Sequence, residues 1–304
     1  MNRRQALKCV AGGLFATRTL AAQQPAFRSR FARGNNLGVL DVGGSNVLCF
    51  RMPTSAFILV DVGASKNKER VLEAIKTVGG SAKVQIVFNT HYHADQTGNN
   101  EVFAADGAKI IAHEHTRQWM RTDHWVPDQD RYERARLQAA WPTETFRTTG
   151  SLKSGNQTIE YGHLPLAHTD GDIYVFLREV NVLAVGDVAS PLLDPALDWF
   201  TGAWIGGRLD AMDAILKLSD DQTKIVPASG PVMSRAEFKE ERDMMEEVRS
   251  RVWKHILQGE SPKEMLDAGV LNGLLRTWKD PYKFLYDAAK GMFAHHNKLD
   301  TSIQ

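Results

Sequence analysis

The sequence contains little cysteine and no long apolar run. Only Cys9 and Cys49 are present among 304 residues, so neither a disulfide framework nor a thiolate zinc site is expected. The longest apolar candidate, residues 10–16, is far shorter than the roughly 18 residues that a bilayer-spanning helix needs. We therefore expect no stable insertion into a membrane.

The chain also has no large excess of positively or negatively charged residues. Lys and Arg total 37, Asp and Glu total 36, and the formal net charge is +1. A nucleic-acid-binding surface normally needs a basic excess, so no nucleic-acid partner is expected. The 43% hydrophobic and 24% charged residues are globular proportions, which excludes a disordered or collagen-like chain.

The N-terminus has the layout of a bacterial export signal. Arg3 and Arg4 precede a mildly apolar stretch at residues 9–16 and a Leu-Ala-Ala sequence at residues 20–22. This layout is similar to a twin-arginine signal; the alternative is a basic N-terminus without a targeting role. We expect residues 1–22 to direct the folded protein to the periplasm or outside a bacterial cell.

Short apolar runs between turn residues predict two β-rich blocks, each followed by helices. The expected strands are residues 37–42, 46–51, 56–61, 84–88, 108–112, 158–166, 173–177, 180–185 and 224–227, and the expected helices are residues 66–78 and 210–218. This order favours two stacked sheets with helices outside. After Ser234, which can cap a helix with Glu237 at the capping-box position, only helices are expected, with short ones broken at Gly269, Asn272 and Pro281.

The strongest chemical signal is the segment His91-Tyr-His93-Ala-Asp95-Gln96, directly after a predicted buried strand. In an extended segment, residues two apart project to the same side, so both imidazoles and the carboxylate can converge. His168 and Asp187, in loops beside later strands, are further candidate ligands. Imidazoles with carboxylates suit Zn(II) in an open tetrahedral site.

These residues resemble the metallo-β-lactamase superfamily over about residues 37–232. His91, His93 and Asp95 match the family's His-x-His-x-Asp motif, His168 its third-motif histidine, and Asp187 its bridging aspartate. The resemblance implies an α/β (α+β) fold: an αββα sandwich of two mixed β-sheets flanked by helices, with metal-binding loops at one edge. Residues 233–304 are then a helical C-terminal extension packed on the core.

The chain departs from the family pattern at two positions. Gln96 stands where a histidine usually follows the aspartate, and Ser229 stands where the last motif usually has a histidine. Both missing histidines would serve a second metal. We therefore expect one Zn(II) site with three imidazoles, and a second site reduced to Asp95 and Asp187.

Further polar residues are expected to brace the ligands. Asp61 looks like the family's first-motif carboxylate, and Asp172 lies in the loop of His168; both can hydrogen-bond ring N–H groups or loop backbone. Gln96 has an alternative role as a donor to a bound anion. The remaining histidines are expected in surface, core or bracing positions rather than as ligands: His113, His115, His124, His163, His255, His295 and His296.

Two aromatic-rich segments are candidates for the wall of a substrate pocket. Residues 114–146 contain three tryptophans and a tyrosine, and residues 191–207 contain Trp199, Phe200 and Trp204. The alternative is helix packing, which fits the helix-like residues 128–140. If both segments face the zinc, the pocket suits a small-molecule substrate with an apolar or aromatic portion.

The expected activity is hydrolysis by a zinc-bound hydroxide, because zinc lowers the pKa of its bound water to about 7. Asp95 is the expected general acid/base. The expected substrate is an ester, thioester, lactone, amide or lactam; a phosphodiester is less favoured because no basic cluster lies near the motifs. The alternative is a non-catalytic, degenerate periplasmic binding protein, which the loss of two metal histidines would fit.

Restoring the two missing histidines should restore a second metal site. We predict that Gln96→His combined with Ser229→His increases affinity for a second zinc ion by more than the two single changes add up to, since imidazole is a far better zinc ligand than an amide or hydroxyl oxygen. Zinc titration of the four proteins measures this. Unchanged binding by the double variant would show that the two positions do not face one metal.

Overall fold

The computed structural model describes residues 36–79 and 82–299. The predicted export signal at residues 1–22 and the last five residues of the chain therefore lie outside the described residues.

The first sheet is mixed. Its strands β1, β2 and β3 form an antiparallel meander, and β4, β5 and β8 continue it in parallel. In spatial order they are β1 (Leu37–Asp41), β2 (Asn46–Arg51), β3 (Phe57–Val60), β4 (Val84–Phe88), β5 (Lys109–His113) and β8 (Glu144–Phe146). The parallel pairing places the carboxyl ends of β3 and β4 at one edge, where Asp61 and the His91 segment follow.

The second sheet is also mixed, because β12 and β13 run parallel while the other neighbours run antiparallel. In spatial order its strands are β14 (Met233–Ser234), β13 (Lys224–Pro227), β12 (Val182–Gly186), β11 (Ile173–Leu177), β10 (Gln157–His163) and β9 (Thr149–Ser154). The loop of His168 joins β10 to β11, and Asp187 directly follows β12.

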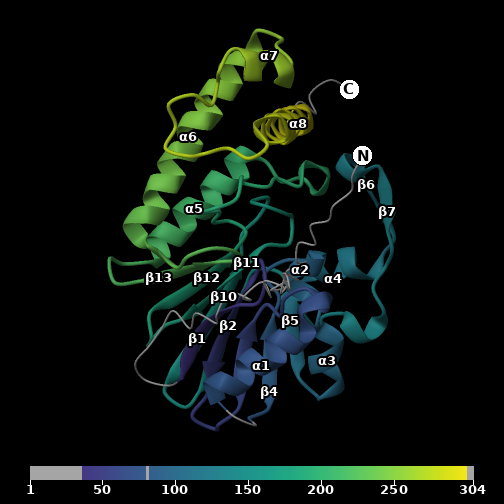
Figure 1. The fold of residues 1–304 in the computed structure, drawn as a ribbon, viewed down its shortest axis with the longest axis vertical. Helices are drawn as coiled ribbons and strands as arrows, with labels where there is room; N and C mark the ends of the chain where they lie inside the picture. The colour runs from purple at the N-terminus through teal and green to yellow at the C-terminus, as the bar shows by residue number, and fades with distance from the viewer. Residues whose placement is uncertain (1–35, 80–81, 300–304) are drawn as a thin grey trace, which may run out of the picture.

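Helices cover the outer faces of both sheets (Figure 1). The helices of the described residues are α1 (Lys68–Gly79), α2 (Ala94–Thr97), α3 (Asn100–Ala105), α4 (Glu114–Arg121), α5 (Ile205–Leu218), α6 (Arg235–Leu257), α7 (Pro262–Asp267) and α8 (Pro281–Leu299). Among the described residues, no helix is both long enough and apolar enough to cross a membrane.

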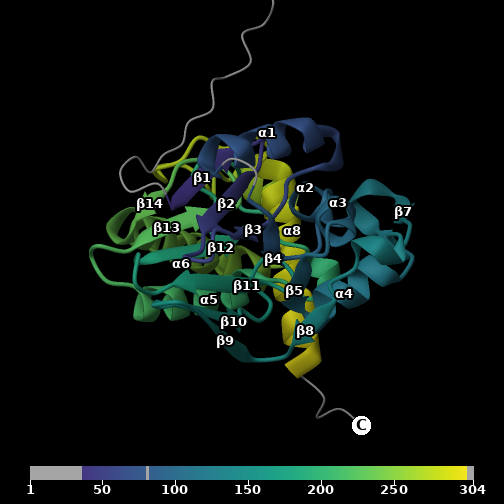
Figure 2. The ribbon, with the colours of Figure 1, turned by 90° about the horizontal axis from the view of Figure 1, so that it is seen from below.

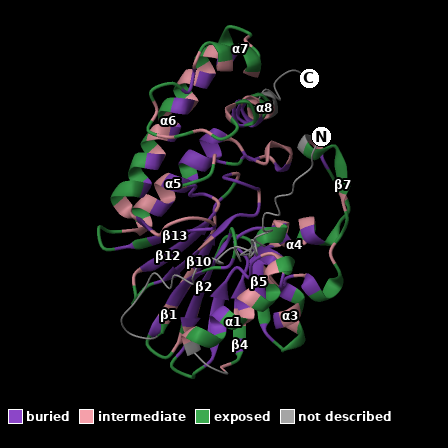
Figure 3. Cartoon of the chain, in the orientation of Figure 1, coloured by how far each residue is buried: buried purple, intermediate pink, exposed green. Residues whose placement is uncertain are grey.

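The layers follow from the alternation of side chains along the strands. In β2, Leu48 and Phe50 point into the apolar cluster between the two sheets, whereas Val47 and Cys49 point into the cluster beneath α1. The outer face of the second sheet packs on α5, α6 and α8. Figure 2 shows the resulting order of helix, sheet, sheet and helix, and Figure 3 shows both sheets largely buried. The predicted αββα sandwich is confirmed.

The helices after residue 234 share one apolar cluster with the second sheet. Ser234 accepts a hydrogen bond from the Glu237 N–H in a complete capping box at the start of α6. The buried Phe238 and Met245 of α6 pack in the same cluster as Ile225 of β13. Contrary to expectation, Pro281 begins the 19-residue α8 rather than ending a short helix, because proline is well tolerated in the first turn of a helix.

A hairpin replaces the helix expected at residues 128–140. Strands β6 (His124–Val126) and β7 (Arg131–Glu133) pair antiparallel, and Asp130 joins them in the left-handed conformation with φ of 47°. Aspartate tolerates this conformation in turns better than most residues do. The helical expectation was wrong, apart from short 3₁₀ turns at Pro127–Gln129 and Gln138–Ala140.

The cluster between the sheets should dominate the stability of the fold. Phe88 is fully buried there, so Phe88→Ala should lower the free energy of unfolding by about 3–5 kcal/mol, from lost apolar burial and the cavity left behind. Leu257→Ala, at a position 69% exposed on α6, is the control and should change it by less than about 0.5 kcal/mol. Urea unfolding of both variants measures this, and similar losses in the two would contradict it.

Candidate metal centre

Three imidazoles and a carboxylate converge where strands of both sheets end. His91, His93, His168 and Asp187 each offer a ligand atom, and these atoms all lie within 4.8 Å of one another. The three rings lie with centroids 4.7–4.9 Å apart and at steep angles of 72–88°, so their nitrogens rather than their faces meet. The arrangement fits a metal site.

His91 is fully buried directly after β4. Its Nδ1 lies 3.0 Å from Thr90 Oγ1, and that hydroxyl donates to Asp61 Oδ2 at 2.8 Å. Since the Thr90 proton is directed to Asp61, the hydroxyl oxygen accepts from His91 Nδ1–H. The Nε2 atom is left unprotonated and has no hydrogen-bond partner among the described residues. Burial, followed by the neighbouring His168 and His93, holds the pKa of His91 well below its ordinary value.

A buried nitrogen acceptor without a partner is unusual, because no hydrogen bond then offsets the free energy lost by removing it from water. The nearest charged group is Asp187, whose Oδ2 lies 3.4 Å from His91 Nε2. A carboxylate cannot donate a hydrogen bond to this nitrogen, so the two acceptors face each other. A cation between them would satisfy both, which is how the donor set fits a metal ion.

His168 is held by the loop between β10 and β11. Its Nδ1 donates to Ala196 O at 3.0 Å, and its Nε2 lies 3.1 Å from His93 Nδ1. Asp172 accepts from the N–H groups of His168 and Thr169 at 2.6 and 2.7 Å, and so ties down the backbone of the loop. Burial raises the pKa of Asp172 to about 6, although these donors oppose the shift.

Asp198 is a functional candidate that the sequence reasoning missed. Its Oδ2 lies 2.8 Å from His93 Nε2 and also accepts from the Tyr92 hydroxyl at 2.8 Å. Burial lowers the pKa of His93, but the Asp198 carboxylate outweighs it and raises that pKa to about 9. With Nε2 held by Asp198, His93 presents Nδ1 to the centre. No motif marks Asp198, which lies 105 residues further along the chain.

Asp95 does not join the four converging atoms. The extended segment ends at His93, and Asp95 lies in the first turn of α2, where helical rotation replaces the two-residue alternation on which its prediction depended. Its Oδ2 accepts from Gln96 Nε2 at 3.2 Å. Gln96 itself is buried, and its Oε1 has no partner among the described residues.

Ser229 and Trp204 are the two remaining predicted site residues. Ser229 is half-buried in the loop after β13, and Asn46 Nδ2 holds this loop by donating to Pro227 O and Gly230 O. Trp204 stacks on His295 of α8, with ring centroids 3.6 Å apart. Trp204 is not among the residues that line the cavity beside His93, and its substrate-facing role stays a prediction.

Some histidines outside the motif form a separate cluster. His113 at the end of β5 stacks on His163 at the end of β10, with ring centroids 3.7 Å apart, and His115 meets His113 edge-on. Burial lowers the pKa of His113 to about 4. His113 donates to Arg147 O, whereas His115 of α4 and His163 of β10 donate to Asp170 O and so tie α4 and β10 to the loop of His168.

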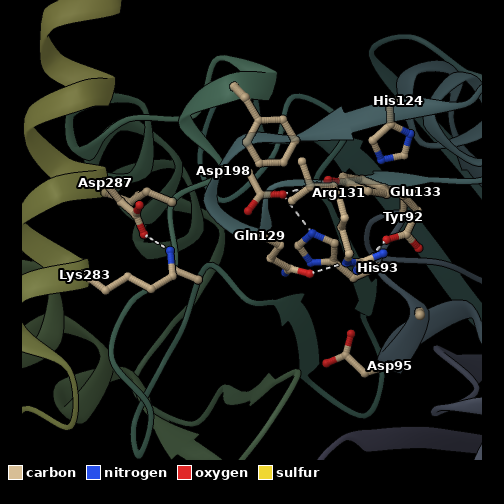
Figure 4. Close-up of a pocket in the computed structure, with 15 residues that line it drawn as sticks. Tyr92, His93, Asp95, His124, Gln129, Arg131, Glu133, Asp198, Lys283 and Asp287 are labelled. Carbon is tan, nitrogen blue, oxygen red and sulfur yellow. Dashed lines mark hydrogen bonds and ion pairs between the residues drawn. The ribbon is translucent and has the colours of Figure 1, made fainter.

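A cavity of about 360 Å³ opens beside His93 and Asp95 (Figure 4). The figure shows Arg131 and Glu133 of the hairpin on one side and Lys283 and Asp287 of α8 on the other. Tyr92 and Phe200 supply aromatic surface, with smaller apolar contributions from Ala94, Val126, Ala196 and Leu197. Residues of both aromatic-rich segments therefore line this cavity, but none of their tryptophans does.

The comparisons with known proteins agree with this fold. The metallo-beta-lactamase superfamily profile matches residues 40–230, which is more than half of the chain. The chain belongs to the metallo-beta-lactamase superfamily. A search of curated proteins finds no match.

Solved structures share the fold at low identity. A metallo-beta-lactamase from Pontibacter korlensis is 18% identical with a TM-score of 0.57, over 71% of this chain and 97% of its own. The DIM-1 metallo-beta-lactamase is 19% identical with a TM-score of 0.55, over 73% and 98%. The sec-alkylsulfatase Pisa1 from Pseudomonas sp. is 14% identical with a TM-score of 0.63, over 87% of this chain but only half of its own length. Such identities show the fold alone.

Asp198 should control how well His93 binds a metal. Asp198→Asn removes the charge that holds His93 Nε2–H, so zinc affinity should fall about 10- to 100-fold, as is typical for groups that orient metal-ligating histidines. Tyr92→Phe, which loses a hydrogen bond to the same oxygen but keeps the carboxylate, is the matched comparison and should have a smaller effect. Competition with a chromogenic chelator measures both; equal zinc affinity in wild type and Asp198→Asn would contradict this role.

Proposed function

We propose that the protein is a zinc-dependent hydrolase of small molecules, with one zinc ion held by His91 Nε2, His93 Nδ1 and His168 Nε2. The observation that carries this proposal is the convergence of these nitrogens, one of which is buried without a partner. Three imidazoles with an open fourth position are typical of catalytic rather than structural zinc.

When bound, zinc supplies a Lewis acid and makes water a competent nucleophile near neutral pH. Asp187, with its Oδ2 3.4 Å from His91 Nε2 and 3.8 Å from His168 Nε2, adds a negative charge beside the cluster. Since Gln96 and Ser229 replace two imidazoles, we propose that any second metal binds weakly or not at all.

Asp95 is the proposed general acid/base. It lines the cavity together with His93, and Gln96 Nε2 orients its carboxylate by donating to Oδ2. A carboxylate at this position can accept a proton from the attacking water and deliver it to a leaving group in the same cavity. The same proton path suits an ester, thioester, lactone, amide or lactam.

We propose a sulfate monoester as a second candidate class of substrate. Arg131 and Lys283 approach the cavity from opposite sides, and their ion pairs with Glu133 and Asp287 hold them there. The fold likeness to a sec-alkylsulfatase, which extends over 87% of this chain, supports including this class. Val126, Leu197 and Phe200 offer apolar surface for the remainder of either substrate.

A non-catalytic binding protein is the alternative function. Zinc-dependent turnover of a carboxylic ester, a chromogenic lactam or an aryl or alkyl sulfate would exclude it, and zinc binding without turnover of any of them would favour it. Export by the twin-arginine route to the periplasm or beyond is proposed on the sequence of residues 1–22 alone.

Zinc and activity should be lost together when a cluster histidine is removed. We predict that His168→Ala binds less than about a tenth of the zinc bound by wild type and loses hydrolysis, because only two imidazoles remain. His255→Ala is the control: His255 pairs with Glu260 at the end of α6 and should affect neither property. Metal analysis and turnover of the three proteins test this, and full zinc occupancy in His168→Ala would refute the three-histidine site.

A further inference from the structure

One loop connects the proposed metal centre to the C-terminal helices. Residues 187–198 run from the end of β12 to the 3₁₀ turn Trp199–Thr201. The loop begins with Asp187, and near its end Ala196 O accepts from His168 Nδ1 and Asp198 Oδ2 binds His93 Nε2. The course of this loop therefore determines how two of the three imidazoles are oriented.

Every polar group of Ser190, in the middle of this loop, is bound by a charged side chain from outside it. Its N–H donates to Glu241 Oε1 at 2.8 Å. Its hydroxyl accepts from Arg208 Nη2 at 2.9 Å, and its carbonyl accepts from Arg276 Nη2 at 2.6 Å. Arg276 also donates to Leu193 O, so it binds the loop at two points.

The three charged side chains form one buried cluster. Glu241 Oε1 lies 3.6 Å from a guanidinium nitrogen of both Arg208 and Arg276. The side chains of Arg208, Glu241 and Arg276 are only 0%, 4% and 10% exposed. Burying such charges costs desolvation energy that mutual attraction rarely exceeds, so net stability is a weak explanation for the cluster.

The cluster reaches the imidazoles through short steps. Arg208 Nη1 lies 3.5 Å from Ala196 O, the same carbonyl that accepts from His168 Nδ1. The Asp198 N–H in turn donates to His168 O at 3.0 Å. Movement of Ser190 would therefore shift Ala196 O, which determines which nitrogen of His168 is protonated. It would also shift the Asp198 carboxylate, which binds His93.

We propose that Glu241 is a positioning residue for the metal centre: with Arg208 and Arg276 it clamps Ser190 and thereby sets the orientation of His168 and His93. The inference rests on the metal site proposed above. Glu241 lies in α6 and Arg276 in the connection between α7 and α8, both beyond the residues 40–230 that match the family profile. The C-terminal helices are accordingly part of the metal site's support.

The test compares Glu241→Ala with Glu241→Gln in the full-length protein. The glutamine keeps an oxygen acceptor for the Ser190 N–H, whereas the alanine does not. In Glu241→Ala the zinc dissociation constant should rise at least about tenfold, and ¹⁵N NMR of the metal-free protein should show His168 losing its single Nδ1–H tautomer. Glu241→Gln should retain that tautomer and most of the zinc affinity.

Asp213→Ala is the matched control. Asp213 of α5 pairs with Arg242 of α6 at 2.8 Å, so this variant also breaks an ion pair between the two helices but leaves the loop untouched. It should leave zinc affinity and the His168 tautomer unchanged. If Glu241→Ala lowers only the unfolding temperature, and zinc affinity and tautomer stay at wild-type values, the positioning role is overturned.

A second variant covers the case in which Glu241→Ala does not fold. Arg276→Met keeps an apolar stem and leaves Glu241 paired with Arg208, but removes the donors to Ser190 O and Leu193 O. It should weaken zinc binding in the same direction, and unchanged zinc affinity would overturn the proposal. None of these measurements needs turnover, so a wild-type protein without hydrolytic activity would refute the proposed function and leave this inference standing.

Discussion

The metal centre depends on which ring nitrogen of each clustered histidine is hydrogen-bonded to an oxygen outside the cluster. A neutral imidazole carries one N–H, and each ring has an oxygen beside the nitrogen that points away from the centre. These oxygens are Thr90 Oγ1 for His91, Asp198 Oδ2 for His93 and Ala196 O for His168. The other three nitrogens then face one another, and their lone pairs repel when all three rings are neutral. A cation removes that conflict, and in its absence the raised pKa of His93, about 9, lets a proton supply the positive charge.

The sandwich supplies these oxygens from far apart in the chain. β4 carries Thr90 and His91 beyond the first sheet, and the β10–β11 loop carries His168 beyond the second sheet. The long loop after β12 provides Ala196 and Asp198. Strands buried on both faces cannot shift register without exposing apolar side chains, so their ends are rigid. The long loop lacks such support, which is why its attachment to α5, α6 and the α7–α8 connection matters for the site.

Much of this could be predicted from the sequence, for identifiable reasons. Apolar runs located the strands, including β4 and β11 at their observed bounds, and the motif around His91 with His168 and Asp187 identified the converging groups. Asp198 could not be predicted, because only the folded path of a long loop brings it to His93. Asp95 lies outside the four converging groups, because a helix begins one residue before it and ends the two-residue alternation. The packing of Trp204 on His295 of α8 could not be predicted either, because no local pattern records a tertiary contact.

Zinc-edge X-ray absorption of the purified zinc protein tests the central claim most directly, because it counts ligands without requiring a substrate. The account predicts three imidazole nitrogens at about 2.0–2.1 Å, with the remaining coordination from oxygen and no sulfur. A spectrum with fewer than three imidazoles, or one with sulfur at about 2.3 Å, would contradict the assignment of His91, His93 and His168 as the metal ligands.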